Sequence, residues 1–206
     1  MSERLEARRS ALLLFDFLEG HVNRDEASRQ RYAPVVANAA ALLAAARKAG
    51  ALVIYANADH RPGGETAGRT LRDTDNRLQA IAPGDGAAHK PLITGGTPEA
   101  RVVAALAPRS DDFIVPKHRW SAFHGTYLET ALRACGVDTI VLAGGSTDVG
   151  IASTAFAARD LDYSLVIVAD ACTSPEKDNH DQLMRRIFPR MARVRTTREV
   201  TAMLGA

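Results

Sequence analysis

The chain has 206 residues, 46% hydrophobic and 24% charged, which predicts one globular domain, residues 1–206, and excludes a disordered or fibrous chain. The formal charge is +2, from 26 basic and 24 acidic residues. Because the basic residues are scattered except in the stretch 185–198, nucleic acid is not expected as a partner.

The first half of the chain alternates apolar runs with helical and polar segments. The apolar runs 11–15 and 51–56 each predict a buried strand. Between them, Pro34 predicts the start of an alanine-rich helix, and Gly50 predicts its end. The segment 57–96 is long and polar, and we interpret it as a lid or wall of a binding site.

The second half repeats the same alternation. Thr97 and Pro98 have the character of an N-cap and a first helical residue, and Thr126 can cap a later helix. The predicted helices are 97–106, 126–136 and 148–161, and the predicted strands are 112–115, 137–143 and 164–169. Beyond residue 170 we expect a helix, a strand and a final helix. The arginines there are interpreted as a solvated helix face, with an anion-binding patch as the alternative.

Strands that alternate with helices and are continuously apolar indicate a parallel sheet covered on both faces. The predicted fold class is α/β: a three-layer, doubly wound, Rossmann-like domain with a mainly parallel six-stranded sheet. Ligands of such sheets bind outside the carboxyl ends of the strands, near the point where the strand order reverses. Asp16, Lys117 and the turn 144–150 all follow predicted strands, so we expect the site there.

Several features predict what the protein lacks. The apolar runs are too short to cross a bilayer and residues 1–10 are charged, so we expect no membrane contact and a cytoplasmic location.

Cys135 and Cys172 have neither metal-ligand spacing nor the density of a disulfide framework, and we expect both to be reduced. Asp59 and His60 alone are a weak metal signal. We therefore predict no metal and no cofactor.

Asp16 and Lys117 are the candidates for acid–base chemistry. Asp16 follows five apolar residues, so its carboxylate would emerge in a partly desolvated place suited to proton transfer. A turn or helix cap is the alternative. Lys117 follows the third predicted strand and could shuttle a proton with a nearby carboxylate or bind an anionic substrate. For Lys117 the alternative is a surface ion pair.

The residues after Lys117 are candidates for contacts with a small-molecule substrate. Trp120 and Phe123 could form substrate platforms, although aromatic residues more often serve packing. His124 could contact substrate, and a solvated loop histidine is the alternative.

The turn 144–150 joins a predicted buried strand to a helix, so it exposes backbone N–H groups at a helix N-terminus where an anion or oxyanion can bind. Gly145, Ser146 and Val149 are the predicted substrate contacts in this turn. Its glycine spacing is not that of a dinucleotide-binding loop. A simple tight turn remains open.

Four stretches together resemble the isochorismatase-like hydrolases. They are Leu-Phe-Asp at 14–16, Lys-His-Arg-Trp-Ser-Ala-Phe-His-Gly-Thr-Tyr-Leu at 117–128, Ala-Gly-Gly-Ser-Thr-Asp-Val-Gly-Ile-Ala-Ser-Thr-Ala at 143–155, and Val-Ala-Asp-Ala-Cys at 168–172. The resemblance spans nearly the whole chain, and only 57–96 matches poorly. The order and spacing of the four stretches are more specific than any one of them.

The resemblance implies that Asp16 and Lys117 are catalytic and that Gly150 occupies the third catalytic position. Most members, such as nicotinamidases and N-carbamoylsarcosine amidases, have a nucleophilic cysteine there, with the aspartate as its base. Isochorismatases proper have glycine and cleave an enol ether, with the aspartate as proton donor and no covalent intermediate. The resemblance also implies a non-proline cis peptide near Gly145 and Ser146, and a homo-oligomer, either dimer or tetramer.

The leading hypothesis is a hydrolase that acts on a small polar or anionic molecule by Asp/Lys acid–base catalysis, without a cysteine nucleophile. Turn amides near Gly150 would stabilise developing negative charge. The bond cleaved would be an ether or a C–N bond, and direct activation of water by Asp16 is one route to the latter. The alternatives are a non-catalytic small-molecule binding protein and a disarmed cysteine amidohydrolase that retain the fold.

Overall fold

A six-stranded sheet, in which all paired strands are parallel, forms the centre of the computed structural model, which describes residues 3–68 and 91–205. The strands are β1 (Ser10–Phe15), β2 (Leu52–Ala58), β3 (Phe113–Lys117), β4 (Thr139–Gly145), β5 (Ser164–Thr173) and β6 (Arg193–Arg195). They lie in the order β3-β2-β1-β4-β5-β6, which reverses direction between β1 and β4. This confirms the predicted doubly wound α/β fold.

The continuous apolar strands are explained by burial on both faces of the sheet. All six residues of β1 are buried. Because successive side chains point to opposite faces, Leu12 and Leu14 join one core, while Leu13 and Phe15 join the other. Phe15 therefore faces the same side as α4, which carries the residues after Gly150.

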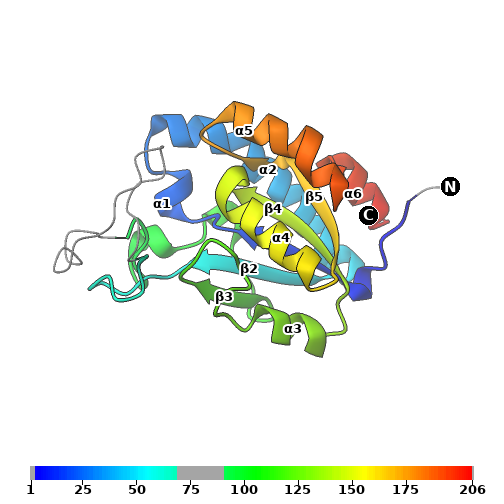
Figure 1. The fold of residues 1–206 in the computed structure, drawn as a ribbon, viewed down its shortest axis with the longest axis horizontal. Helices are drawn as coiled ribbons and strands as arrows, with labels where there is room; N and C mark the ends of the chain where they lie inside the picture. Colours follow the sequence, from blue (N-terminus) through cyan, green and yellow to red (C-terminus); the bar gives the residue numbers. More distant parts are fainter. Residues whose placement is uncertain (1–2, 69–90, 206) are drawn as a thin grey trace.

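Helices cover both faces of the sheet (Figure 1). They are α1 (Glu19–Val22), α2 (Glu26–Ala49), α3 (Leu128–Ala134), α4 (Ala152–Asp160), α5 (Lys177–Gln182) and α6 (Thr197–Met203). Leu42 of α2 and Val200 of α6 belong to one core, and Leu132 of α3 and Ala155 of α4 belong to the other. In Figure 1, α4 lies in front of the sheet and α2 behind it.

The first long helix starts earlier than expected. Its predicted end at Gly50 is confirmed, because Gly50 adopts a left-handed conformation with φ 78°. Its predicted start at Pro34 is wrong, because α2 begins at Glu26 and contains Pro34. The start is fixed by Asp25, whose side chain accepts a hydrogen bond of 2.7 Å from the N–H of Ser28.

The helix expected at 97–106 is also wrong. The segment forms two short 3₁₀ turns, Pro98–Ala100 and Ala104–Leu106, with extended residues between them. Val102 pairs with Leu18, and the N–H of Val103 donates to the carbonyl of Phe17 at 3.0 Å. Tertiary pairing with the chain that leaves β1 therefore overrides the local helix signal.

Other boundaries shift less. The helix predicted from residue 148 opens with a π-helical turn, Thr147–Ile151, before α4. The helix predicted from Thr126 begins at Leu128, whose N–H donates to the hydroxyl of Thr126 at 3.2 Å. β5 continues past its predicted end because a register shift lets Cys172 pair with Gly144 of β4.

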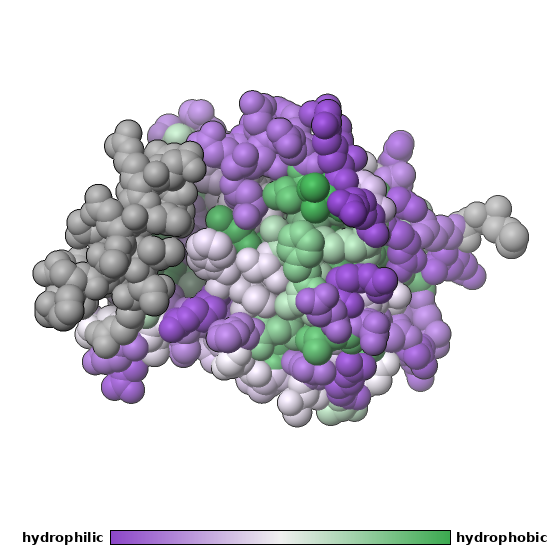
Figure 2. All heavy atoms as spheres, in the orientation of Figure 1, coloured by the Kyte–Doolittle hydropathy of each residue, from purple (hydrophilic) through white to green (hydrophobic). Residues whose placement is uncertain are grey.

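Much of the visible surface is hydrophilic, and an apolar patch lies over α4 (Figure 2). Phe156 of α4 is 48% exposed. Within residues 3–68 and 91–205, no helix combines the length and hydropathy that a membrane span requires. The homo-oligomer implied by the resemblance stays a prediction.

Candidate active site

Asp16 follows β1 at the carboxyl edge of the sheet, where β2 fixes its position. Its N–H donates to the carbonyl of Ala56 at 3.0 Å, and its Oδ1 accepts from the N–H of Ala58 at 2.7 Å. Its φ of 53° lies in the left-handed region, which Asp adopts more readily than most residues. The carboxylate is therefore held in one direction, with Oδ2 available to a further partner.

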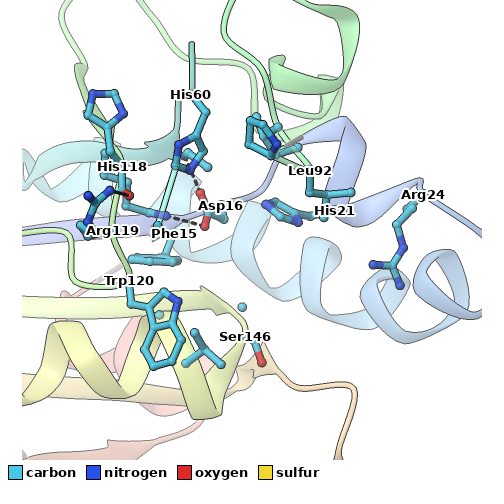
Figure 3. A pocket seen from close by; sticks show the side chains of 18 of the residues that line it. Phe15, Asp16, His21, Arg24, His60, Leu92, His118, Arg119, Trp120 and Ser146 are labelled. Carbon is cyan, nitrogen blue, oxygen red and sulfur yellow. Dashed lines mark hydrogen bonds and ion pairs between the residues drawn. The ribbon is translucent and has the colours of Figure 1, made fainter. Parts of the chain in front are cut away.

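Lys117 supplies that partner from the end of β3. Its Nζ donates to Oδ2 of Asp16 at 2.7 Å, and the two side chains are only 5% and 10% exposed. The same Nζ lies 4.2 Å from the centre of the Phe15 ring, which sits directly beside the pair (Figure 3). The pair is therefore buried rather than a surface ion pair. It places a proton acceptor next to a proton donor at the sheet edge.

The turn after β4 brings Gly150 to the same edge. The Gly145–Ser146 peptide is cis, in agreement with the resemblance. The π-helical turn that follows contains Val149 and Gly150, and both line the same cavity as Asp16.

Asp148 anchors this turn to the segment that follows β5. Its carboxylate accepts hydrogen bonds from Ser146, from Ser174 at 2.8 Å and from Asn179 of α5 at 2.9 Å. Burial raises the pKa of Asp148, but the hydrogen bonds outweigh it and leave the pKa below its ordinary value. The ionised carboxylate thus ties the turn to residues 26 and 31 positions further along the chain.

A cavity of about 430 Å³ opens over these groups. Its only acidic lining residue, among the residues that the structure describes, is Asp16. The basic and histidine side chains that line it are Arg24, Arg31, Lys117, Arg119, His21, His60 and His118. Because four Lys or Arg cations face a single carboxylate, the cavity favours a negatively charged ligand.

Three nitrogen atoms on this lining are buried and have no hydrogen-bond partner within the described part of the chain. They are Nε2 of His21, Nε of Arg31 and Nδ1 of His118. A buried polar group without a partner costs about 1–3 kcal/mol, so these nitrogens are suited to groups supplied by a ligand.

The histidines also make stability depend on pH. Burial lowers the pKa of His21 below its ordinary value of 6.5; the charge of Asp16 opposes this effect, and the charges of Lys117 and Arg24 add to it. The unfolded chain therefore binds more protons as the pH falls below about 6.5, so the free energy of unfolding decreases there. Between pH 7 and pH 5, His21→Gln should lose less stability than the unsubstituted protein, by up to about 1 kcal/mol per pH unit, in urea unfolding.

The matched control for this measurement is His124→Gln, because His124 is exposed and outside the cavity. It should retain the pH dependence of the unsubstituted protein. If both variants show the same dependence, burial of His21 is not its source. His60 and His180, whose pKa values burial also lowers, account for the dependence that remains in His21→Gln.

The structure brings most of the predicted site residues together. Those that line the cavity are Asp16, Lys117, Trp120, Gly145, Ser146, Val149 and Gly150. Trp120 is 57% exposed and projects from the segment after β3 (Figure 3). Phe123 and His124 do not line it: Phe123 packs against Tyr163 at 5.9 Å between ring centres, and His124 is exposed.

One side of the cavity lining was not predicted from the sequence: it is formed by the basic and histidine side chains of α1, of α2 and of the residues between them. His21, Arg24 and Arg31 follow Asp16 within 15 positions, and that proximity was the available signal. The described ends of the segment 57–96 also line the cavity, through Ala67, Gly68 and residues 91–93, in agreement with a wall. Its residues 69–90 lie outside the described residues.

Neither cysteine lines the cavity. Cys135 is exposed at the end of α3. Cys172 is buried in β5, and burial raises the pKa of its thiol to about 12. No cluster of three or more potential metal ligands occurs among residues 3–68 and 91–205.

Comparison with known proteins identifies a family. The isochorismatase domain matches residues 10–199. The uncharacterized isochorismatase family protein YwoC of Bacillus subtilis (strain 168) is 30% identical over 95% of this chain and 94% of its own length. The uncharacterized isochorismatase family protein YecD of Escherichia coli O157:H7 is 45% identical over 97 residues, about half of each chain (47% and 52%).

Two further proteins are similar over most of their length. The maleamate amidohydrolase of Pseudomonas putida (strain KT2440) is 32% identical over 84% of this chain and 76% of its own. The crystal structure of a cysteine hydrolase from Pseudomonas syringae pv. phaseolicola 1448A is 29% identical, with a TM-score of 0.82 over 98% of this chain and 94% of that one. The domain match, the relatives and the shared fold agree, and the chain belongs to the isochorismatase family.

Proposed function

We propose that the protein is a hydrolase that acts on a small anionic molecule through Asp16 and Lys117, without a cysteine nucleophile. The observation that carries the proposal is the buried Asp16–Lys117 pair, with 2.7 Å between Nζ and Oδ2, on the lining of a cavity where position 150 is glycine. Neither cysteine of the chain reaches that lining.

The pair supplies the proton transfers that hydrolysis needs. The carboxylate of Asp16 takes a proton from a water molecule as the water oxygen bonds to the substrate carbon. When the bond from that carbon to nitrogen or oxygen breaks, Asp16 returns the proton to the leaving atom. Lys117 holds the side chain of Asp16 in place and balances its charge whenever it is ionised. A C–N bond next to a carbonyl can be cleaved in this way. An enol ether needs the opposite order: the protonated Asp16 carboxyl first gives its proton to the terminal alkene carbon, water then adds to the ether carbon and returns a proton to Asp16, and the adduct divides into a ketone and an alcohol.

The charge of the lining supports an anionic substrate. Arg24 and Arg31 come from the α1–α2 side, and Arg119 comes from the segment after β3. A guanidinium binds a carboxylate with two parallel hydrogen bonds, which fixes orientation as well as affinity. One similar protein is named for its action on maleamate, a small acid amide, and supports a carboxylate-bearing C–N substrate among the candidates.

The test is a panel of small acids offered to the purified protein: maleamate, a ureido acid and isochorismate. At least one should be hydrolysed, and the rate should survive complete alkylation of Cys135 by iodoacetamide, because no thiol takes part. Turnover that disappears on alkylation would contradict a thiol-free mechanism. Absence of turnover on the whole panel, together with tight binding of one of these acids, would instead identify a binding protein.

A further inference from the structure

We infer that Phe15 determines the mechanism of this site: its ring fills the volume that a side chain at position 150 would need, which excludes a thiol nucleophile and keeps hydrolysis non-covalent. The statement about hydrolysis rests on the proposed function. The complementarity of Phe15 and Gly150 rests on geometry alone.

The space beside Gly150 is taken by a single side chain. A Cβ added at Gly150 would lie 2.2 Å from Cε1, 2.4 Å from Cζ and 3.2 Å from Cδ1 of Phe15. Real Cβ contacts essentially never fall below 3.0 Å. The three nearest atoms all belong to the Phe15 ring, so this ring is the obstacle to any larger residue.

The backbone does not itself demand glycine at position 150. Gly150 lies in a π-helical turn and has no positive φ, unlike Gly144, whose φ is 136°. Any residue can adopt a helical backbone conformation. The requirement for glycine therefore comes from packing against Phe15.

The ring is buried and borders the cavity. Phe15 is 1% exposed, belongs to the core on the α4 face of the sheet, and also lines the cavity. The ring also contacts the Nζ of Lys117, which lies 4.2 Å from the ring centre, within the range of a cation–π contact. The same ring therefore fills the space beside Gly150 and contacts the ammonium that binds Asp16.

The volume that Phe15 fills is one in which a thiol would be reactive. Position 150 lies in the turn that opens α4, and it shares the cavity with Lys117. A helix N-terminus and a nearby cation both favour thiolate over thiol. Because residue 150 is glycine and the Phe15 ring occupies the space of its missing side chain, this edge of the sheet supplies Asp16 and Lys117 but no nucleophilic side chain.

The test compares Phe15→Val, Gly150→Cys and the double variant Phe15→Val/Gly150→Cys with the unsubstituted protein. Overpacking should lower the Tm of Gly150→Cys by about 5 °C, and its introduced thiol should react slowly with iodoacetamide. The double variant should have nearly the same Tm as Phe15→Val alone, because the smaller side chain leaves room for the cysteine. Its introduced thiol should react at least about 10-fold faster than in the single variant, because the ring no longer covers it. Peptide mass mapping separates this thiol from Cys135 and Cys172.

The matched control is Phe17→Val/Gly150→Cys. Phe17 is also 1% exposed, but it belongs to the core on the opposite face of the sheet. It should neither relieve the effect of Gly150→Cys nor speed alkylation. The inference is overturned if Gly150→Cys alone keeps the original Tm and reacts as fast as the double variant, or if the Phe17 control restores both properties equally. Because neither readout needs a substrate, failure of the proposed hydrolysis would be seen separately, in the panel.

Discussion

Asp16→Asn should lower kcat/KM by at least about 10³-fold on whichever acid of the panel is hydrolysed, since positioned acid–base groups contribute about 10²–10⁴-fold. Asparagine preserves the shape of the side chain and can still accept from the N–H of Ala58. It cannot take a proton from water at Oδ2, where Lys117 now binds. The measurement is steady-state kinetics, with circular dichroism to verify that the variant is folded.

Asp59→Asn is the matched control for this loss. Asp59 directly follows β2, the strand next to β1, but it does not line the cavity. The same chemical change there should alter kcat/KM by no more than about 3-fold, as expected of a carboxylate outside the reaction. Retention of a tenth or more of the turnover in Asp16→Asn would remove Asp16 from the proposed mechanism.

Lys117→Met should lower the free energy of unfolding by about 3–5 kcal/mol, because it leaves the Asp16 carboxylate buried without its cation. Methionine replaces most of the apolar stem, so the loss reports the charge rather than a cavity. The double variant Asp16→Asn/Lys117→Met should recover much of the loss, since no isolated charge remains. Urea unfolding at constant m-value measures each effect.

A surface ion pair provides the comparison. Lys177 donates to Asp181 at 2.5 Å, but its side chain is 81% exposed. Lys177→Met should leave the urea midpoint unchanged, because water solvates the remaining carboxylate. Equal shifts of the urea midpoint in Lys177→Met and Lys117→Met would mean that the Asp16–Lys117 pair is solvated in solution rather than buried.

The sequence predicts the fold well because the signals are local. Continuous apolar runs reveal strands covered on both faces, and Gly50 ends its helix as a left-handed cap. Prediction from the sequence fails where tertiary contacts determine the local structure. Residues 97–106 have helix-start signals, yet pairing of Val102 with Leu18 draws them into extended structure. The start of α2 was missed for a local reason: the side chain of Asp25 caps the helix eight residues before Pro34, which the helix then accommodates.

The candidate site shows the same division. Asp16 and Lys117 could be found because both lie at the carboxyl ends of strands, and the topology of a parallel sheet places such residues at one edge. The direction of the Phe15 ring could not be found, because it depends on which face of β1 meets α4. Arg24 and Arg31 were missed for a related reason: only the path of α1 and α2 across the sheet edge brings them to the cavity.

The hydrogen bonds of Asp148 have a consequence for the order in which the protein is completed. Four adjacent strands, β1 to β4, are all contained in the chain up to residue 145. The turn that carries Gly150 is bonded to later residues of the chain: Asp148 accepts from Ser174 and Asn179, and Thr147 contacts His180 at 2.9 Å. A growing chain can therefore contain four of the six strands well before it contains the residues that hold the turn of the cavity in place.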